Sequence, residues 1–180
     1  MQPEQLETYY DAVKKVTNLK VGFHGHDNLG MALTNSLKAA ELGISFIDAS
    51  LQGLGRSSGN VSTELFTINA MKQGYDLDID IKKLLLISKK LVYPLVSRKG
   101  INPLDVMCGV SEFHTSYLKY IHEVAGYYGV SPLGLIEAYA SEDKTGINIE
   151  HLRSIAQGLP EDLNSYSDIN FIGYFGNEQK

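Results

Sequence analysis

The sequence has few prolines and no long apolar run. Of its 180 residues, 5 are proline and 17 are glycine, and 43% are hydrophobic against 21% charged. This composition excludes collagen, disordered tails and coiled coils, and it is typical of a globular protein. No stretch approaches the roughly 18 consecutive apolar residues of a membrane span, so no membrane contact is expected.

Cysteine and basic charge are also scarce. Cys108 is the only cysteine, which excludes an intrachain disulfide and a zinc ribbon and fits a reducing compartment. Because the N-terminus lacks the basic and then apolar order of a signal peptide, we expect a cytoplasmic protein. The 16 Lys and Arg against 21 Asp and Glu give a net charge of −5. No basic stripe is present, so nucleic acid is not an expected partner.

The apolar residues of the first half switch between helical and extended spacing. Steps of three and four residues predict helices, and short apolar runs predict buried strands. We expect helices at Pro3–Leu19, Leu29–Leu42 and Thr63–Lys72, and strands at Lys20–Phe23 and Ile44–Leu51. Gly43 stands where a helix ends in a residue with positive φ. This order predicts an α/β fold with parallel strands, in a doubly wound sheet or a (β/α)₈ barrel.

After Asp80 the strand signal disappears. The expected helices are Ile81–Tyr93, Ser116–Tyr128, Pro132–Tyr139 and Ile149–Ile155, with breaks at Pro94, Pro103, Gly129 and Pro132. We therefore expect an α/β domain at 1–100 and an all-helical domain at 101–163. Residues 164–180 are expected to form a loose tail despite the aromatic residues Tyr166, Phe171, Tyr174 and Phe175.

Two histidines follow the first predicted strand. Alternate side chains of an extended chain share a face, so His24 and His26 are expected to point the same way and to place two imidazoles on one metal ion. The alternative is that one histidine packs in the core and the other caps the next helix. The carboxyl ends of parallel strands are where binding sites form, which favours a site.

A glycine-rich loop, Gly53–Asn60, follows the second predicted strand. Adjacent parallel strands lie about 4.8 Å apart, so this loop is expected to fold over the end of the first strand. Asn60 then supplies an oxygen to the same ion, or instead caps the helix that runs through Glu64. The loop lacks the Lys-Ser/Thr ending of a Walker phosphate-binding loop.

These motifs carry a resemblance to a known group. HGHDNLG at 24–30, Ile47-Asp-Ala-Ser-Leu-Gln-Gly-Leu-Gly and Ser58-Gly-Asn-Val-Ser-Thr-Glu occur in order, with a helix between the first two. This run resembles the later barrel half of the divalent-metal aldolase and lyase superfamily. That superfamily includes 4-hydroxy-2-oxovalerate aldolase, HMG-CoA lyase and isopropylmalate synthase. The resemblance implies that His24, His26 and Asn60 are metal ligands, with Mn²⁺ favoured and Mg²⁺, Co²⁺ or Zn²⁺ as alternatives.

The helical tail distinguishes the branches of this superfamily. Tyr117-Leu-Lys, Tyr127-Tyr-Gly-Val, Leu135-Ile-Glu and Ile149-Glu-His-Leu are similar to the C-terminal domain of 4-hydroxy-2-oxovalerate aldolases. The resemblance implies an acylating aldehyde dehydrogenase as a partner. The tail helices carry more aromatic surface than one small domain needs to cover itself, which is typical of an interface; the alternative is that these residues pack on each other and on the barrel part. The glycine-rich loop has Arg56-Ser-Ser where the lyase branch carries a catalytic cysteine.

A complete barrel takes about 250 residues, so this sequence can supply only a fraction of one, and the resemblance implies that this fraction is a late part. The resemblance places the remaining metal ligand (an Asp), a substrate-binding Arg and a general-base His in an N-terminal half, so no catalytic residue is assigned here. Asp27 and Asp48 are interpreted as residues that support the ligands or cap helices. Met1-Gln-Pro-Glu resembles an internal segment of the family.

The expected activity is cleavage of a 4-hydroxy-2-oxoacid to pyruvate and an aldehyde by a metal-dependent aldolase of which this chain is a part. The alternatives are an HMG-CoA lyase or isopropylmalate synthase type of reaction, and a non-catalytic interaction domain. Because a piece of a barrel exposes strand edges, self-association is also expected.

Overall fold

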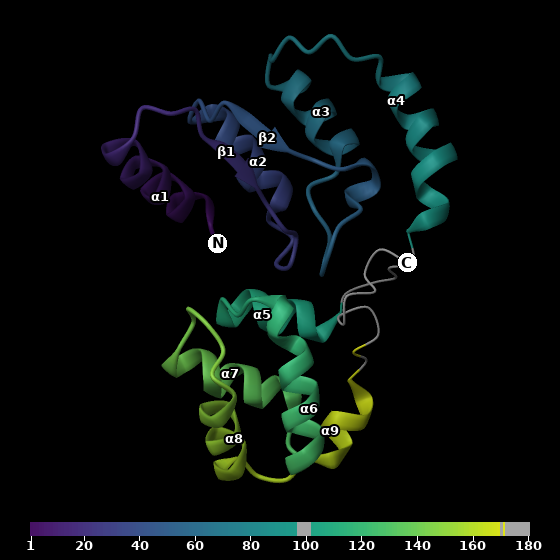
Figure 1. Ribbon diagram of the computed structural model, residues 1–180. Coiled ribbons are helices and arrows are strands. Elements are labelled where there is room, and N and C mark those ends of the chain that lie inside the picture. The colour runs from purple at the N-terminus through teal and green to yellow at the C-terminus, as the bar shows by residue number, and fades with distance from the viewer. Residues whose placement is uncertain (97–101, 170, 172–180) are drawn as a thin grey trace. The chain divides into compact units, whose positions relative to one another are not determined.

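The structure is a computed structural model that describes residues 1–96, 102–169 and 171. The chain forms two compact units, Met1–Gly100 and Ile101–Lys180. Each unit has its own arrangement of elements (Figure 1). Within the described ranges, no helix is long and apolar enough to cross a membrane.

The first unit alternates helices and strands before it becomes helical. Its elements in chain order are α1 (Pro3–Val16), β1 (Gly22–His24), α2 (Ala32–Glu41), β2 (Phe46–Asp48), the 3₁₀ turn η1 (Leu51–Gly53), α3 (Thr63–Lys72), α4 (Ile81–Ile87), the π-helical segment η2 (Ser88–Val92) and the 3₁₀ turn η3 (Tyr93–Leu95). The expected helix and strand order is confirmed, although both strands are shorter than predicted.

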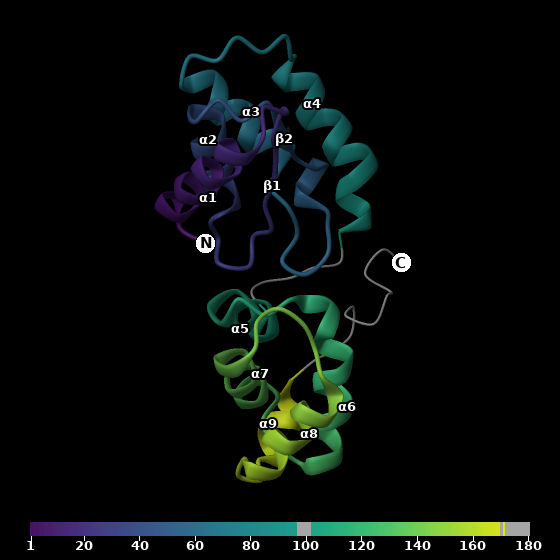
Figure 2. The ribbon, with the colours of Figure 1, turned by 60° about the vertical axis from the view of Figure 1, so that its left-hand side comes forward.

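The two strands form a parallel pair, which confirms the expected α/β fold (Figure 2). Their register sets Phe23 opposite Ile47 and His24 opposite Asp48. Phe23 and Ile47 pack against the core formed by Leu6, Ala39 and Ile44. Since side chains alternate along a strand, His24 and Asp48 lie on the opposite, exposed face.

Local signals explain where the helices of this unit begin and end. Pro3 opens α1, where its missing N–H costs no hydrogen bond. Gly43 ends α2 with φ 78°, as its position predicted. Ser62 caps α3 by accepting a hydrogen bond from the backbone N–H of Leu65 at 3.3 Å.

The described elements of the second unit are all helices or 3₁₀ turns, apart from an isolated bridge between Val130 and Glu161. Its elements are α5 (Pro103–Ser111), the 3₁₀ turn η4 (Thr115–Tyr117), α6 (Leu118–Tyr128), α7 (Pro132–Glu142), α8 (Ile149–Gly158) and α9 (Leu163–Asp168). Its buried core consists of Leu104, Cys108, Phe113, Leu118, Ile121, Val124, Ala125, Val130, Leu135, Ile136, Tyr139, Ala140, Leu152, Ala156 and Phe171.

Helix α5 was not predicted, because Pro103 was interpreted as a break. Pro103 is the first residue of the helix, and Asn102 caps it by accepting from the backbone N–H of Leu104 at 3.0 Å. Ser131 and Pro132 begin α7 in the same way. Proline at the start of a helix therefore marks an N-terminus rather than an interruption.

The prediction of a loose tail from residue 164 is wrong for the described part of that segment. Asn164 lies in α9, and Tyr166 packs against the core of the second unit. Phe171 is buried, and its ring lies edge to face with that of His122. Burial of these rings orders the chain. Tyr174 and Phe175 lie outside the described residues.

The expected surplus of exposed aromatic surface in the tail helices is also wrong. Tyr139 is fully buried, and Tyr117, Tyr120 and Tyr128 pack against the same core. Tyr127 is the exception among these tyrosines, with 83% of its surface exposed. The helices thus use most of their aromatic side chains to cover one another.

Candidate metal centre

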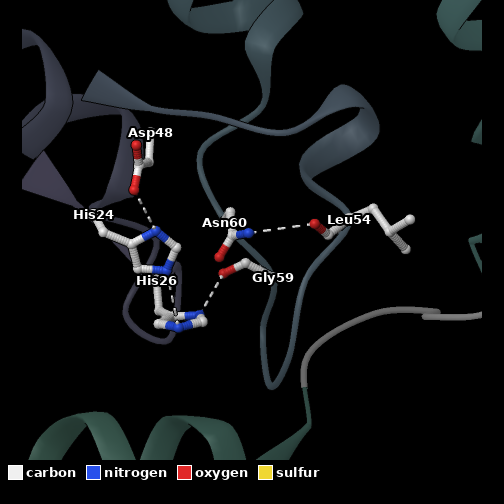
Figure 3. A network of polar contacts seen from close by, with 6 residues as sticks. All are labelled: His24, His26, Asp48, Leu54, Gly59 and Asn60. Carbon is white, nitrogen blue, oxygen red and sulfur yellow. Dashed lines mark hydrogen bonds and ion pairs between the residues drawn. The ribbon is translucent and has the colours of Figure 1, made fainter. Parts of the chain in front are cut away.

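His24 and His26 converge at the end of β1. Their Nε2 atoms lie 3.4 Å apart, and the rings meet edge to face with centroids separated by 4.9 Å (Figure 3). Neither histidine is buried in the core, and the first N–H of α2, that of Ala32, is accepted by Asp27 at 2.9 Å. The alternative of one core histidine and one capping histidine is therefore wrong.

The Nδ1 atom of each histidine has its own acceptor. Nδ1 of His24 lies 3.4 Å from Oδ2 of Asp48, and Nδ1 of His26 lies 3.3 Å from the carbonyl oxygen of Gly59 (Figure 3). An acceptor at Nδ1 favours the tautomer that carries its proton there. Both Nε2 lone pairs are then directed into the space between the rings.

Electrostatics keep His26 in the form that binds metals. Partial burial lowers the pKa of His26, and a charge on the neighbouring His24 would lower it further. A lowered pKa favours the neutral imidazole, which has the free lone pair that a metal requires.

Asn60 lies beside the histidines, paired to His26 by an isolated antiparallel bridge. Its Nδ2 donates to the carbonyl oxygen of Leu54 at 3.3 Å, and its Oδ1 is buried without a hydrogen-bond partner. In Figure 3 the nitrogen points to Leu54 and the oxygen points away from it, on the side of the imidazoles. Because Ser62 caps α3, the capping alternative for Asn60 is wrong.

Two glycines allow the loop to pack directly on Asn60. A Cβ at Gly55 would lie 2.5 Å from Nδ2 of Asn60. At Gly53, whose φ is 65°, a Cβ would lie 2.9 Å from the carbonyl oxygen of Asn60. Gly55 thus allows close packing against the side chain of Asn60 and Gly53 against its backbone, which fits the absence of a phosphate-binding motif.

The donor set fits a divalent cation in part. Two nitrogens that each lie about 2.1 Å from one ion are about 3.0–3.4 Å apart at octahedral or tetrahedral angles, and the two Nε2 atoms are 3.4 Å apart. An unsatisfied buried acceptor costs about 1–3 kcal/mol, and a cation would satisfy Oδ1 of Asn60. In the described part of the chain, no three His, Cys, Asp or Glu residues cluster as a complete site.

One functional candidate was not assigned a role from the sequence. Glu64 appears in the motif as its last residue, yet its carboxylate accepts hydrogen bonds from Gln52, Ser62 and Ser88 beneath the glycine-rich loop. Ser88 is 24 positions away from it. The one clue to the role of Glu64 is that its carboxylate is buried. Helical spacing in the sequence does not show this burial, so the role could not be predicted.

The geometry and the motifs agree with a comparison against protein families. A family model described as HMGL-like matches residues 1–91. The chain therefore belongs to the HMGL-like family, and the resemblance drawn from the motifs is confirmed.

Curated relatives point to one branch of this family. The chain is 34% identical to a 4-hydroxy-2-oxovalerate aldolase of Desulfitobacterium hafniense over 136 residues, which are 75% of this chain and 41% of that protein. It is 32% identical to the enzyme of the same name from Geobacillus genomosp. 3 over 165 residues, covering 88% of this chain and 49% of the relative. The chain thus spans about half the length of the curated relatives it matches.

Solved structures support the fold. The N-terminal domain of a putative aldolase from Bacteroides vulgatus matches with a TM-score of 0.58 and 28% identity, covering 79% of this chain and 42% of that one. The carboxyl transferase domain of Rhizobium etli pyruvate carboxylase matches with a TM-score of 0.65 over 88% of this chain and 30% of the other. Its identity of 18% supports the fold alone.

Proposed function

We propose that this chain provides the metal-binding part of a divalent-metal-dependent aldolase that cleaves a 4-hydroxy-2-oxoacid to pyruvate and an aldehyde. The observation that carries the proposal is the convergence of the two Nε2 atoms beside the unpartnered Oδ1 of Asn60. The names of the curated relatives support the substrate class.

His24, His26 and Asn60 would hold the ion. Imidazole and amide oxygen are compatible with Mn²⁺, and also with Mg²⁺, Co²⁺ or Zn²⁺. When bound, the ion would act as a Lewis acid on the oxygens of the 2-oxoacid. Asp48 and the carbonyl of Gly59 orient the imidazoles through Nδ1, which keeps each Nε2 available.

The remaining parts of the reaction are proposed to lie outside these residues. Cleavage between C3 and C4 requires a base that takes the 4-hydroxyl proton, and the resemblance assigns this base and a substrate-binding Arg to an N-terminal half. We propose that β1, β2 and their helices are a late part of a (β/α)₈ barrel and that the second unit is its helical tail domain. The proposed compartment is the cytoplasm.

The proposed protein partner is an acylating aldehyde dehydrogenase, which would consume the released aldehyde. The support is the similarity of the helical unit to the tail of the aldolases. Its aromatic residues give no further support, because most of them are buried in the core of the unit. Capture of a purified acylating aldehyde dehydrogenase by the immobilised chain tests this proposal. A dehydrogenase that passes through unretained at tens of micromolar would reject it.

The function is tested by metal binding and by pyruvate formation. Mn²⁺ titrations followed by electron paramagnetic resonance should show weak binding, because two histidines and a neutral amide provide no anionic ligand. The binding should be lost in the double variant His24→Ala/His26→Ala. The control is His114→Ala/His151→Ala, which removes two histidines of the helical unit and should leave Mn²⁺ binding unchanged.

Pyruvate release from 4-hydroxy-2-oxovalerate is then measured with and without the N-terminal half of a related aldolase. We expect Mn²⁺-dependent pyruvate only when that half is added and His24 and His26 are intact. Mn²⁺ binding that is equal in the double variant would remove the site from consideration. Metal binding without any pyruvate in the complemented mixture would favour the non-catalytic interaction domain.

A further inference from the structure

Glu64 is a buried carboxylate of α3 that joins this helix to η1 and η2 in the first unit. Only 5% of its surface is exposed. It accepts hydrogen bonds from the backbone N–H of Gln52 at 3.0 and 3.1 Å, from Nε2 of Gln52 at 3.1 Å, from Oγ of Ser62 at 2.6 Å and from Oγ of Ser88. These donors belong to η1, the N-cap of α3 and η2, and all of them are neutral.

Burial of a charge is unfavourable unless hydrogen bonds compensate for it. A buried carboxylate at this position is therefore less favourable in free energy than a neutral side chain would be, if its role were only to fix the loop. What the carboxylate specifically holds is the backbone of Gln52, which has φ 59°. A non-glycine residue with positive φ needs support from its surroundings, and two carboxylate oxygens on one N–H provide it.

The segment held by Glu64 is the one that holds Asn60. Gly53 follows Gln52 directly, and its carbonyl oxygen accepts the backbone N–H of Asn60 at 3.0 Å. Leu54 comes next, and its carbonyl oxygen accepts Nδ2 of Asn60 at 3.3 Å. The position of these two carbonyls decides which way the Asn60 amide faces, and thus where Oδ1 points.

We propose that Glu64 is a positioning residue for the metal site, which acts by fixing the Leu51–Leu54 segment that orients the side chain of Asn60. The inference rests on the proposed function, because it assigns the role through a ligand of the proposed ion. Glu64 itself would not be a ligand of the ion. It sets Oδ1 of Asn60 toward the imidazoles while Nδ2 is occupied by Leu54.

The variant Glu64→Gln tests this role with little change in shape. It places an NH₂ group among donors that need an acceptor, so at least one hydrogen bond to Gln52, Ser62 or Ser88 is lost. We expect the affinity for Mn²⁺ to fall about tenfold, the scale seen when residues that orient metal ligands are changed. Glu4→Gln removes the same charge from the exposed first turn of α1 and should leave the affinity unchanged.

A double-mutant cycle separates positioning from a general loss of structure. In the background of Asn60→Ala there is no amide to orient, so Glu64→Gln should have no further effect on Mn²⁺ affinity. If Glu64 only stabilises the unit, the affinity should fall by the same factor in both backgrounds. A second readout is the side-chain ¹⁵N–¹H₂ signal of Asn60, which should shift in Glu64→Gln and not in Glu4→Gln.

Gln52→Gly provides a second route should Glu64→Gln fail to fold. It removes the side-chain bonds to Glu64 and Ser88, keeps the backbone N–H and tolerates the positive φ. A smaller loss of affinity is expected, again absent in the Asn60→Ala background. If Glu64→Gln and Gln52→Gly bind Mn²⁺ with the same affinity as the wild type, this inference alone is overturned. Wild-type chain whose Mn²⁺ binding does not depend on His24 and His26 overturns the proposed function.

Discussion

His24 and Asp48 stand in register on the two parallel strands, and Nδ1 of the histidine lies 3.4 Å from Oδ2 of the carboxylate. The pair is solvent-accessible, with side chains 48% and 70% exposed, so its direct contribution to stability is small. Its value lies in orientation, because the carboxylate holds the ring with Nε2 directed at His26.

This relationship predicts the effect of Asp48→Asn on metal binding. The amide is a weaker acceptor for Nδ1–H and can present a donor instead, so the histidine loses part of its orientation. We expect Mn²⁺ affinity to fall about tenfold while the melting temperature changes little. Asp11→Asn, which removes an exposed charge from α1, is the matched control. Equal Mn²⁺ affinities for wild type and Asp48→Asn would show that Asp48 does not orient the site.

Glu64 predicts how the stability of the first unit depends on pH. Burial alone raises the pKa of Glu64, but hydrogen bonds from Ser62, Ser88 and the backbone of Gln52 outweigh it, and the net pKa lies below the usual 4.5. A carboxylate whose pKa is lowered by folding stabilises the protein above its unfolded pKa, and the stabilisation is lost as pH falls through the folded pKa.

The free energy of unfolding should therefore decrease below about pH 4.5 in the wild type. It should decrease less steeply in Glu64→Gln, because that variant has no carboxylate to protonate at this position. Urea unfolding between pH 3 and 7, followed by circular dichroism, checks this. Parallel pH curves for the two proteins would contradict the lowered pKa of Glu64.

We expect the stability of the helical unit to depend on the packing of its own core. Leu104 is fully buried, and α5, which carries it, packs against α7. Leu104→Ala should lower the free energy of unfolding by about 2–5 kcal/mol, because it leaves a cavity where the core was filled. Tyr127→Ala, at a side chain 83% exposed, should change it by less than about 0.5 kcal/mol. Denaturant unfolding monitored by tyrosine fluorescence distinguishes the two variants.

The strands predict self-association of the isolated chain. The described sheet has two strands, so each presents an outer edge with unpaired backbone groups. Phe46, 56% exposed on β2, adds apolar surface to the open face of this sheet. Analytical ultracentrifugation at tens of micromolar should show a dimer or larger species.

Phe46→Asp should weaken this association, because it places a charge in the expected contact. Tyr9→Asp, at a position 59% exposed on α1, should leave the association unchanged. The N-terminal half of a related aldolase should compete with the association. A wild-type chain that stays monomeric and does not respond to the added half would show that the strand edges do not drive association.

The helix and strand order of the first unit could be predicted from the sequence, since apolar spacing and residues such as Gly43 act locally. The convergence of His24 and His26 could also be predicted, because side chains alternate along an extended segment whatever the rest of the fold does. Pro103 shows the limit of local rules: the same residue that ends a helix also begins one, and the cap formed by Asn102 decides between them.

Features that depend on contacts between distant segments could not be predicted from the sequence. The direction of Oδ1 in Asn60 depends on Leu54 across the loop, and the burial of Glu64 depends on Ser88, 24 residues further along. Tyr166 and Phe171 have defined positions because their rings pack in the core of the second unit. Such features follow from which surfaces meet in space, and the spacing of residues in one segment does not contain that information.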